Sequence, residues 1–171
     1  MKKIWSALLA LFIVFTFFGC KDVKKMKTPP TVNPKFEADA DVKFKDVNIN
    51  CHIKQKNFED SEIYLNKPDE LNGLKITRTQ DECSLRFKKM NFNMDMSKFP
   101  KASFAEIILK CYASLVNTEN LKVTKEDKYF VYEGNIENGK FIIKQNGDTG
   151  DIERIEVPDA DLVAEFTNIK R

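Results

Sequence analysis

Residues 36–53, FEADADVKFKDVNINCHI, carry the pattern that most clearly indicates the fold. Apolar side chains occupy every second position from Phe36 to Phe44, and charged side chains occupy most of the positions between them. The alternation resumes from Val47 to Ile53 after a short polar link. Because successive side chains of a strand point to opposite faces, this period of two predicts two β-strands with one dry face and one wet face.

The same alternation of apolar and polar residues recurs along the rest of the chain. Nine further short runs alternate in this way and are separated by polar turns: residues 62–65, 74–79, 83–87, 90–94, 121–126, 129–136, 140–145, 152–157 and 162–166. Short alternating strands joined by turns are typical of an antiparallel sheet with one buried face. The chain from residue 36 onward therefore predicts a mainly β domain.

One segment has a different period. Ser103 and Glu106 have the spacing of a helix-capping box, and the apolar residues behind them recur at helical spacing as far as Leu115. Residues 103–116 are therefore expected to form an amphipathic helix, whose apolar side needs a dry surface to cover it. We expect an α+β fold in which a curved antiparallel half-barrel of about 10–11 strands wraps around this one helix.

The N-terminus predicts export. A basic start (MKK), an apolar run over residues 4–18 and a small residue at Gly19 are typical of a secretory signal peptide, here residues 1–19. The run is shorter than the roughly 20 residues of a membrane-spanning helix, although a transmembrane anchor with an incidental Cys20 is the alternative. FFGC, residues 17–20, resembles the lipobox of bacterial lipoproteins. That resemblance implies cleavage after Gly19 and a diacylglyceryl group on the Cys20 thiol, so the domain is expected to be extracytoplasmic and lipid-anchored at the outer face of the cell membrane.

Residues 20–35 comprise Cys20 and a predicted flexible tether, KDVKKMKTPPTVNPK. Its lysines are either simply solvated or attracted to acidic lipid headgroups. Of the chain's 28 basic and 26 acidic residues, 21 basic and 25 acidic remain from Phe36 onward, a net charge of −4. Residues 36–171 are long enough for one domain and carry no basic patch of the kind that nucleic-acid binding requires.

The order of the strands, with the helix after about six of them, resembles the LolA-like family, and especially its small clostridial-type lipoproteins. PDELNGL at residues 68–74 resembles a turn element of that group, and Phe99-Pro100 with Ser103-Phe104 resembles its helix entry. Further residues resemble its C-terminal strands: Gly134, Phe141, Ile143, Thr149-Gly150, Ile152, Ile155, Val157-Pro158 and Phe166. The resemblance implies one LolA-like domain over residues 36–171, an incomplete barrel covered by helix whose hollow can hold acyl chains. The lipoprotein carriers of the family have more cover than the one helix expected here.

An apolar stripe is the predicted ligand site. Met90, Phe92 and Met94 alternate with polar residues, and flexible methionines suit a pocket for variable apolar ligands. The alternative is ordinary core packing against the helix. If a cavity exists, its walls are expected to come from Leu85, Phe87, Met90, Phe92, Met94, Phe104, Ile108 and Cys111.

No catalytic, cofactor or metal-binding pattern is recognised. His52 is expected on the wet face, and no nucleophile-elbow motif accompanies it. Cys51, Cys83 and Cys111 fall on apolar positions at spacings that match no zinc motif, so they are expected to be free core residues, one disulfide being the alternative. NGDTGD at residues 146–151 is expected to be a hairpin turn, because it lacks the ligand pattern of a calcium loop.

Two functional hypotheses follow. The first is a membrane-anchored module that binds a lipid or another apolar ligand in the half-barrel. The second is a non-enzymatic interaction or structural module of the cell envelope, for example a partner of a cell-wall or sporulation protein, as the resemblance to clostridial lipoproteins implies. An enzyme is the least favoured class, since no constellation of catalytic side chains stands out.

Overall fold

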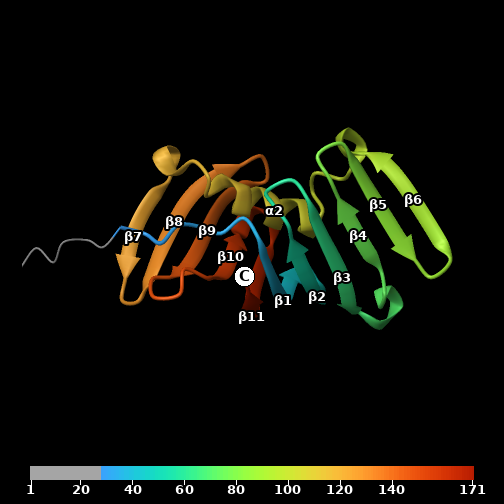
Figure 1. The fold of residues 1–171 in the computed structure, drawn as a ribbon, viewed down its shortest axis with the longest axis horizontal. Helices are drawn as coiled ribbons and strands as arrows, with labels where there is room; N and C mark the ends of the chain where they lie inside the picture. The colour runs from blue at the N-terminus through green and yellow to red at the C-terminus, as the bar shows by residue number, and fades with distance from the viewer. Residues whose placement is uncertain (1–27) are drawn as a thin grey trace, which may run out of the picture.

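The computed structural model describes residues 28–171, which form one antiparallel sheet of eleven strands around an α-helix (Figure 1). The predicted signal peptide, Cys20 and residues 21–27 of the predicted tether lie outside the described residues, whereas residues 28–35 are described and contact the domain through the Pro30 and Asn33 carbonyls, which accept hydrogen bonds from Gln145 and Tyr112. Among the described residues, no helix is long and apolar enough to cross a membrane.

The strands follow the alternation of the sequence closely. They are β1 Phe36–Phe44, β2 Val47–Gln55, β3 Ser61–Lys67, β4 Lys75–Arg78, β5 Glu82–Phe87, β6 Met90–Asp95, β7 Lys122–Glu126, β8 Tyr129–Ile136, β9 Gly139–Asn146, β10 Ile152–Val157 and β11 Leu162–Lys170. All neighbours pair antiparallel in the order β6-β5-β4-β3-β2-β1-β11-β10-β9-β8-β7. The pairing of β1 with β11 joins the two halves of the chain, and the sheet stays open at β6 and at β7.

Tight turns fix the register of three of the hairpins. Lys45, Lys88 and Asp127 each adopt a positive φ between 53° and 55° at the first position of a two-residue connection. Such turns match the twist of the strands that they join. They place the apolar residues of β1 and β2 on the same face, where Ala38, Cys51 and their neighbours are buried.

The helix α2, Phe104–Ser114, begins after Ser103, whose Oγ accepts a hydrogen bond of 3.3 Å from the Glu106 N–H. It crosses the middle of the sheet (Figure 1), and eight of its eleven residues are buried. Short 3-10 helices connect other elements: η2 Asp69–Leu71, η3 Met96–Lys98, η4 Thr118–Asn120 and η5 Pro158–Ala160. The architecture is thus the one predicted from the sequence, an unclosed antiparallel sheet curved around one helix.

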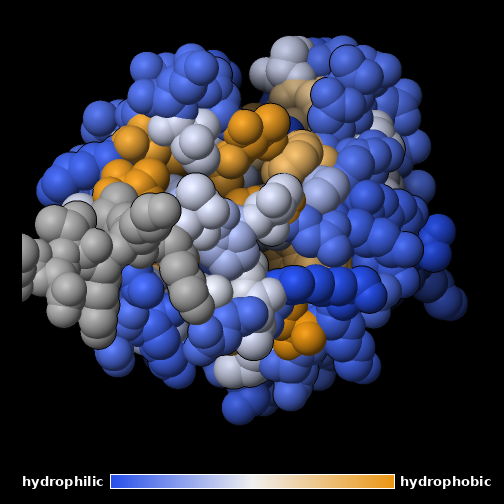
Figure 2. Space-filling model, turned by 60° about the vertical axis from the view of Figure 1, so that its left-hand side comes forward, coloured by the Kyte–Doolittle hydropathy of each residue, from blue (hydrophilic) through white to orange (hydrophobic). Residues whose placement is uncertain are grey.

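The core lies between α2 and the concave face of the sheet. Tyr132, Phe130 and Phe141 are its largest fully buried side chains, and Ile107 and Ile108 meet them from the helix side of the same cluster. From the β7 side, hydrophobic surface is visible between hydrophilic flanks (Figure 2). The dry face predicted from the period of two is therefore the concave face.

Candidate interaction surface

The helix covers only part of the concave face. Eleven residues make a helix about 16 Å long and about 10 Å wide. Eleven strands at a spacing of about 4.8 Å extend over roughly 48 Å along the sheet. The strands at the β6 end extend beyond α2 (Figure 1), so apolar side chains there have no helix above them.

One row of apolar residues shows where the cover ends. Ile53, Ile63, Ile76, Leu85 and Phe92 are successive pairing partners across β2, β3, β4, β5 and β6. Their exposed fraction rises from 0% at Ile53 and 1% at Ile63 to 7% at Ile76 and 59% at Phe92. The sequence stays apolar along the whole row while the burial is lost.

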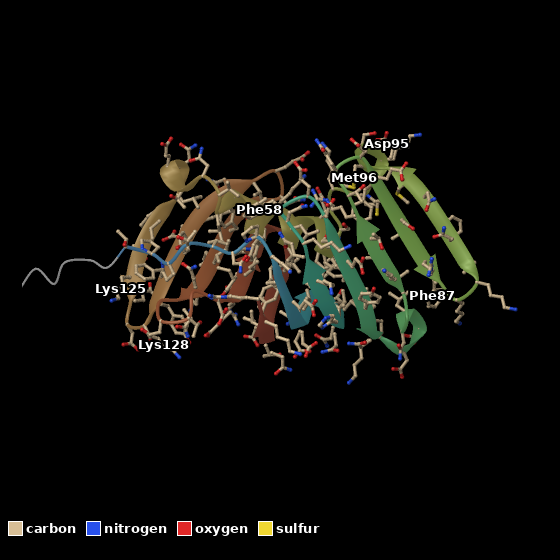
Figure 3. All side chains as sticks on the ribbon, viewed as in Figure 1. Phe58, Phe87, Asp95, Met96, Lys125 and Lys128 are labelled. Atoms are coloured by element: carbon tan, nitrogen blue, oxygen red, sulfur yellow. The ribbon has the colours of Figure 1, made fainter. Side chains whose placement is uncertain are left out.

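The uncovered end of this face carries five apolar residues, which we call the apolar stripe: Leu85, Phe87, Met90, Phe92 and Met94. Phe87 pairs with Met90, Leu85 with Phe92, and Met94 with the buried Cys83, so all five share the concave side of the hairpin. Phe87 lies near the turn, at the opposite end of the hairpin from Asp95 (Figure 3). Met90 is 51% exposed. Phe92 is also exposed, and the other three residues are partly buried; apolar residues that reach the surface together in this way are typical of a binding site.

The backbone of β6 is also unpaired on one side. The Met96 N–H donates to the Asp81 carbonyl at 2.9 Å, so the even-numbered residues of β6 direct their main-chain groups toward β5. Because hydrogen-bonding direction alternates along an antiparallel strand, Asn91 and Asn93 direct theirs outward. Between Met90 and Met94 the edge carries no charged side chain, and its charges lie only at its two ends, at Lys89 and Asp95; the centre of the edge therefore lacks the usual protection against strand addition.

The opposite edge, β7, is protected. Lys122 and Lys125 flank its centre, the Lys122 Nζ lies 2.8 Å from Glu133 Oε1, and the Lys125 Nζ lies 5.9 Å from the centre of the Phe130 ring. Lys125 and Lys128 both lie at this end of the molecule (Figure 3). Lysines on an edge strand oppose the approach of another strand. The two edges of one sheet therefore differ in chemistry, and β6 is the accessible one.

The structure divides the predicted ligand wall into two groups. Phe104, Ile108 and Cys111 are buried residues of α2 and belong to the core. The other five predicted residues form the apolar stripe, of which Leu85 and Met94 are packed partly against the core. That these eight residues line a ligand site stays a prediction.

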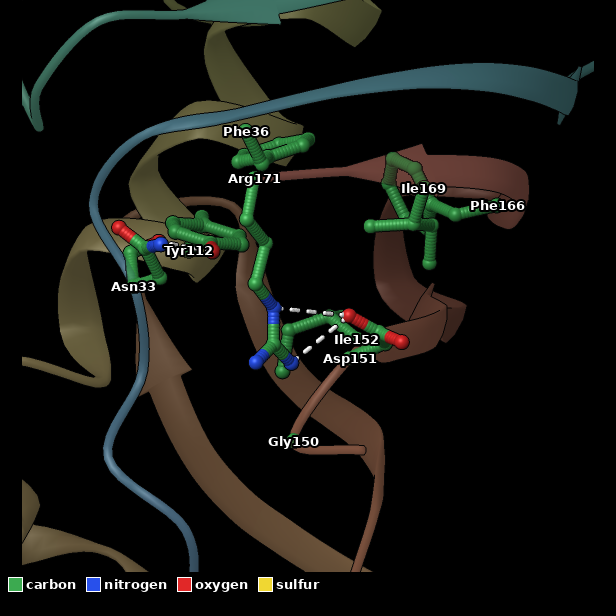
Figure 4. A pocket seen from close by; sticks show the side chains of 9 residues that line it. All are labelled: Asn33, Phe36, Tyr112, Gly150, Asp151, Ile152, Phe166, Ile169 and Arg171. Carbon is green, nitrogen blue, oxygen red and sulfur yellow. Dashed lines mark hydrogen bonds and ion pairs between the residues drawn. The ribbon is translucent and has the colours of Figure 1, made fainter. Parts of the chain in front are cut away.

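A hollow at the junction of α2 with the ends of β1, β10 and β11 is nearly filled (Figure 4). Phe36 and Tyr112 stack there with ring centres 4.8 Å apart, and the Tyr112 hydroxyl donates to the Asn33 carbonyl at 2.6 Å. The Arg171 guanidinium donates to Asp151 Oδ1 at 2.8 Å. The remaining volume is about 10 Å³, which is about the space for one water and far below that of an acyl chain.

Larger hollows are open to solvent. One of about 540 Å³ is lined by residues that include Asp41, Lys43, Arg154 and Glu165. The Arg154 Nε donates a hydrogen bond of 2.5 Å to Glu156 Oε1, and Arg154 is also ion-paired with Glu165; the hydrogen bond to Glu156 is the main cause that raises the Arg154 pKa. Because the hollow is open and several of its lining side chains are charged, it is not an apolar enclosure.

Other sequence candidates occupy structural positions. His52 lies on the outer face, 2.9 Å from Asp39 Oδ1. Cys51, Cys83 and Cys111 are buried and free, and burial is the largest cause that raises their thiol pKa values to about 12, 11 and 12. The 146–151 segment is a turn closed by Asn146 Oδ1, which accepts from the Asp148 and Thr149 N–H groups. Over residues 28–171 no group of three His, Cys, Asp or Glu side chains is placed to hold a metal ion.

Sequence comparison finds no protein-family model and no curated protein that matches this chain. Similar solved structures do exist. An uncharacterised conserved protein from Thermus thermophilus is 8% identical, with a TM-score of 0.53 over 82% of this chain and 80% of that one. The CwlD amidase of Clostridioides difficile in complex with the GerS lipoprotein gives 19% identity and a TM-score of 0.45 over 84% and 83%. A LolA superfamily protein from Nitrosomonas europaea gives 10% and 0.40 over 82% and 86%. At such identities the likeness is one of fold alone.

Proposed function

We propose that this chain is a lipid-anchored, non-enzymatic interaction module of the cell envelope, which binds an extended segment of a partner protein along β6 and the apolar stripe. The observation that carries the proposal is the apolar row that runs uncovered onto an open edge strand. Phe92 is 59% exposed at the end of a row whose other members are progressively buried.

This surface suits strand addition. The outward main-chain groups of Asn91 and Asn93 can pair with an incoming strand, which supplies affinity that is largely independent of sequence. Phe92 and Met90 then supply apolar contacts to alternate side chains of that strand, which supply specificity. Methionine adapts to partners of different shape, because its side chain is unbranched and polarisable.

The anchor would determine which partners are within reach. A diacylglyceryl group on Cys20 would hold the chain to the membrane, and residues 21–27 would link it to the domain, since the Pro30 and Asn33 carbonyls already accept hydrogen bonds from Gln145 and Tyr112. A flexible linker of that length has a root-mean-square reach of about 15 Å. The domain would therefore meet proteins at the membrane surface or in the adjoining cell wall.

An acyl-carrier role is less well supported. It requires a hollow of several hundred cubic ångströms enclosed by apolar groups. The hollow beside Tyr112 offers about 10 Å³, and Ile108 and Cys111, which were expected to line a cavity, are 1% and 0% exposed. The stripe alone leaves an acyl chain open to water along one side.

Site-specific photo-crosslinking in living cells tests the proposal. A benzophenone amino acid at Phe92 should give a covalent adduct with a protein, and the same group at Val116, which is 62% exposed away from β6, should not. Phe92→Asp should abolish capture from a second benzophenone at Met90. Adducts of equal yield at Val116, or adducts with lipid alone at Phe92, would contradict the interaction role. The anchor is tested separately, because Cys20→Ser should move the chain from the detergent phase to the aqueous phase.

A further inference from the structure

We infer that the open edge accepts a second copy of this chain, with β6 pairing antiparallel to β6 of that copy about a two-fold axis at Phe92. The inference rests on the proposed function, since it uses the same surface, and it names one occupant of that surface. It is carried by the self-complementarity of β6 and not by its exposure alone.

The sequence of β6 is self-complementary when two copies pair antiparallel with Phe92 at the centre. In an antiparallel pair centred there, Phe92 faces Phe92, Met90 faces Met94, and Asn91 faces Asn93 of the other copy. Lys89, just before the strand, faces Asp95 at its end. On the concave side, apolar residues thus face apolar residues. On the outer side, the amide of Asn91 faces that of Asn93, and the positive Lys89 faces the negative Asp95.

The hydrogen-bonding pattern of β6 fits the same centre. The main-chain groups of Asn91 and Asn93 direct outward, because the Met96 N–H bonds to Asp81 and the direction alternates along the strand. The facing Asn91–Asn93 pairs are then hydrogen-bonded pairs. Phe92 and its copy form a non-hydrogen-bonded pair, in which Cα atoms approach to about 4.5 Å and side chains are closest.

The charges at the two ends of β6 favour this register over registers shifted by one or two residues. A shift by one residue would set Met90 and Phe92 against the asparagines, because it exchanges the faces of one strand. A shift by two residues keeps the faces but sets Lys89 against Asn93 or Ser97. Neither Lys89 nor Asp95 has an ion-pair partner among residues 28–171, although Asp95 Oδ1 accepts from the Ser97 N–H at 2.8 Å. The second copy supplies the missing partner for both.

Cysteine cross-linking tests the register directly. The full chain is extracted from membranes of a bacterial host in mild detergent and treated with a mild oxidant. Phe92→Cys should give a disulfide-linked dimer, since facing residues here have a Cα separation within disulfide range. Met90→Cys and Met94→Cys should each stay monomeric alone and cross-link when they are co-expressed. Thr124→Cys at the centre of β7 is the matched control and should not cross-link.

Exchange of the charges tests the complementarity. Lys89→Asp should weaken the dimer about tenfold, because two like-charged pairs replace two attractive ones. Adding Asp95→Lys to it should restore the dimer, measured by sedimentation over a dilution series. The inference is overturned if Phe92→Cys gives no more dimer than Thr124→Cys, if Met90→Cys alone cross-links as well as Phe92→Cys, or if the double exchange restores nothing. Photo-adducts of Phe92 with other proteins, without this dimer, would reject the second copy and leave the interaction role standing.

Discussion

At the scale of the residue, Glu106 has a role that its position in the sequence does not indicate. The capping-box spacing is half realised. Ser103 Oγ caps the helix, but the Ser103 N–H donates to the Pro100 carbonyl, and the Glu106 carboxylate lies 3.5 Å from Arg78 Nε and 3.7 Å from Lys110 Nζ. The Glu106 side chain is only 7% exposed. Its charge joins the start of α2 to β4, at the last strand that the helix covers well.

We expect Glu106→Ala to lower the free energy of unfolding by about 2–3 kcal/mol, because it leaves the Arg78 guanidinium mostly buried without a counter-charge. Arg78 retains some exposure, so the loss should stay below that of a fully buried pair. Urea unfolding followed by circular dichroism measures it. The double variant Glu106→Leu with Arg78→Met should recover most of the loss. If the double variant is as unstable as the single one, the loss comes from packing and not from the charge.

At the scale of the element, the period of the apolar residues and the capping box predict the strands and the helix well. They do not predict how much of the sheet the helix covers. Each predicted strand is present to within a few residues, since the alternation of apolar and polar side chains is a local property. Whether Ile76 or Phe92 is buried depends instead on how far an eleven-residue helix extends across the sheet. The two residues lie in the same row and look alike in sequence, and only the tertiary arrangement separates them.

The packing of strand β8 depends on the absence of a side chain at Gly134. A Cβ at this position of β8 would lie 2.5 Å from Leu121 Cδ2 and 2.6 Å from Phe141 Cζ. We expect Gly134→Ala to lower the free energy of unfolding by about 2 kcal/mol through overpacking. The same Gly134→Ala change should cost less when it is made in a Phe141→Leu variant than when it is made in the unchanged chain. Gly73 has nothing within 4 Å of its Cβ position but adopts a φ of +86°, so in the same urea assay Gly73→Ala should lower the free energy of unfolding by about 1 kcal/mol through backbone strain and not through overpacking.

At the scale of the whole molecule, the outer face of the sheet is held by ion pairs between neighbouring strands. Glu37 pairs with Lys54, Glu62 with Lys75, and Glu133 with Lys122 and Lys140. Hydrogen bonds from these lysines lower the pKa values of Glu37 and Glu133, the latter to about 2. The wet face is thus a network of paired charges, which leaves the β6 edge as the surface free to bind.

These pairs predict a loss of stability in acid. A hydrogen bond from the Tyr64 hydroxyl, followed by one from Lys75, lowers the pKa of Glu62 from 4.5 to about 2. Because the lowered value belongs to the folded state, the stabilisation is complete above about pH 5 and is lost as the pH falls from there toward 2. We expect Glu62→Gln to lower the free energy of unfolding by about 1 kcal/mol at pH 7 and to have little effect near pH 2. Urea titrations at pH 7, 4 and 2.5 measure this, with Glu59→Gln, an exposed carboxylate outside these pairs, as the control. A Glu62→Gln effect that is equal at all three pH values would mean that the hydrogen bonds to Glu62 do not depend on its charge.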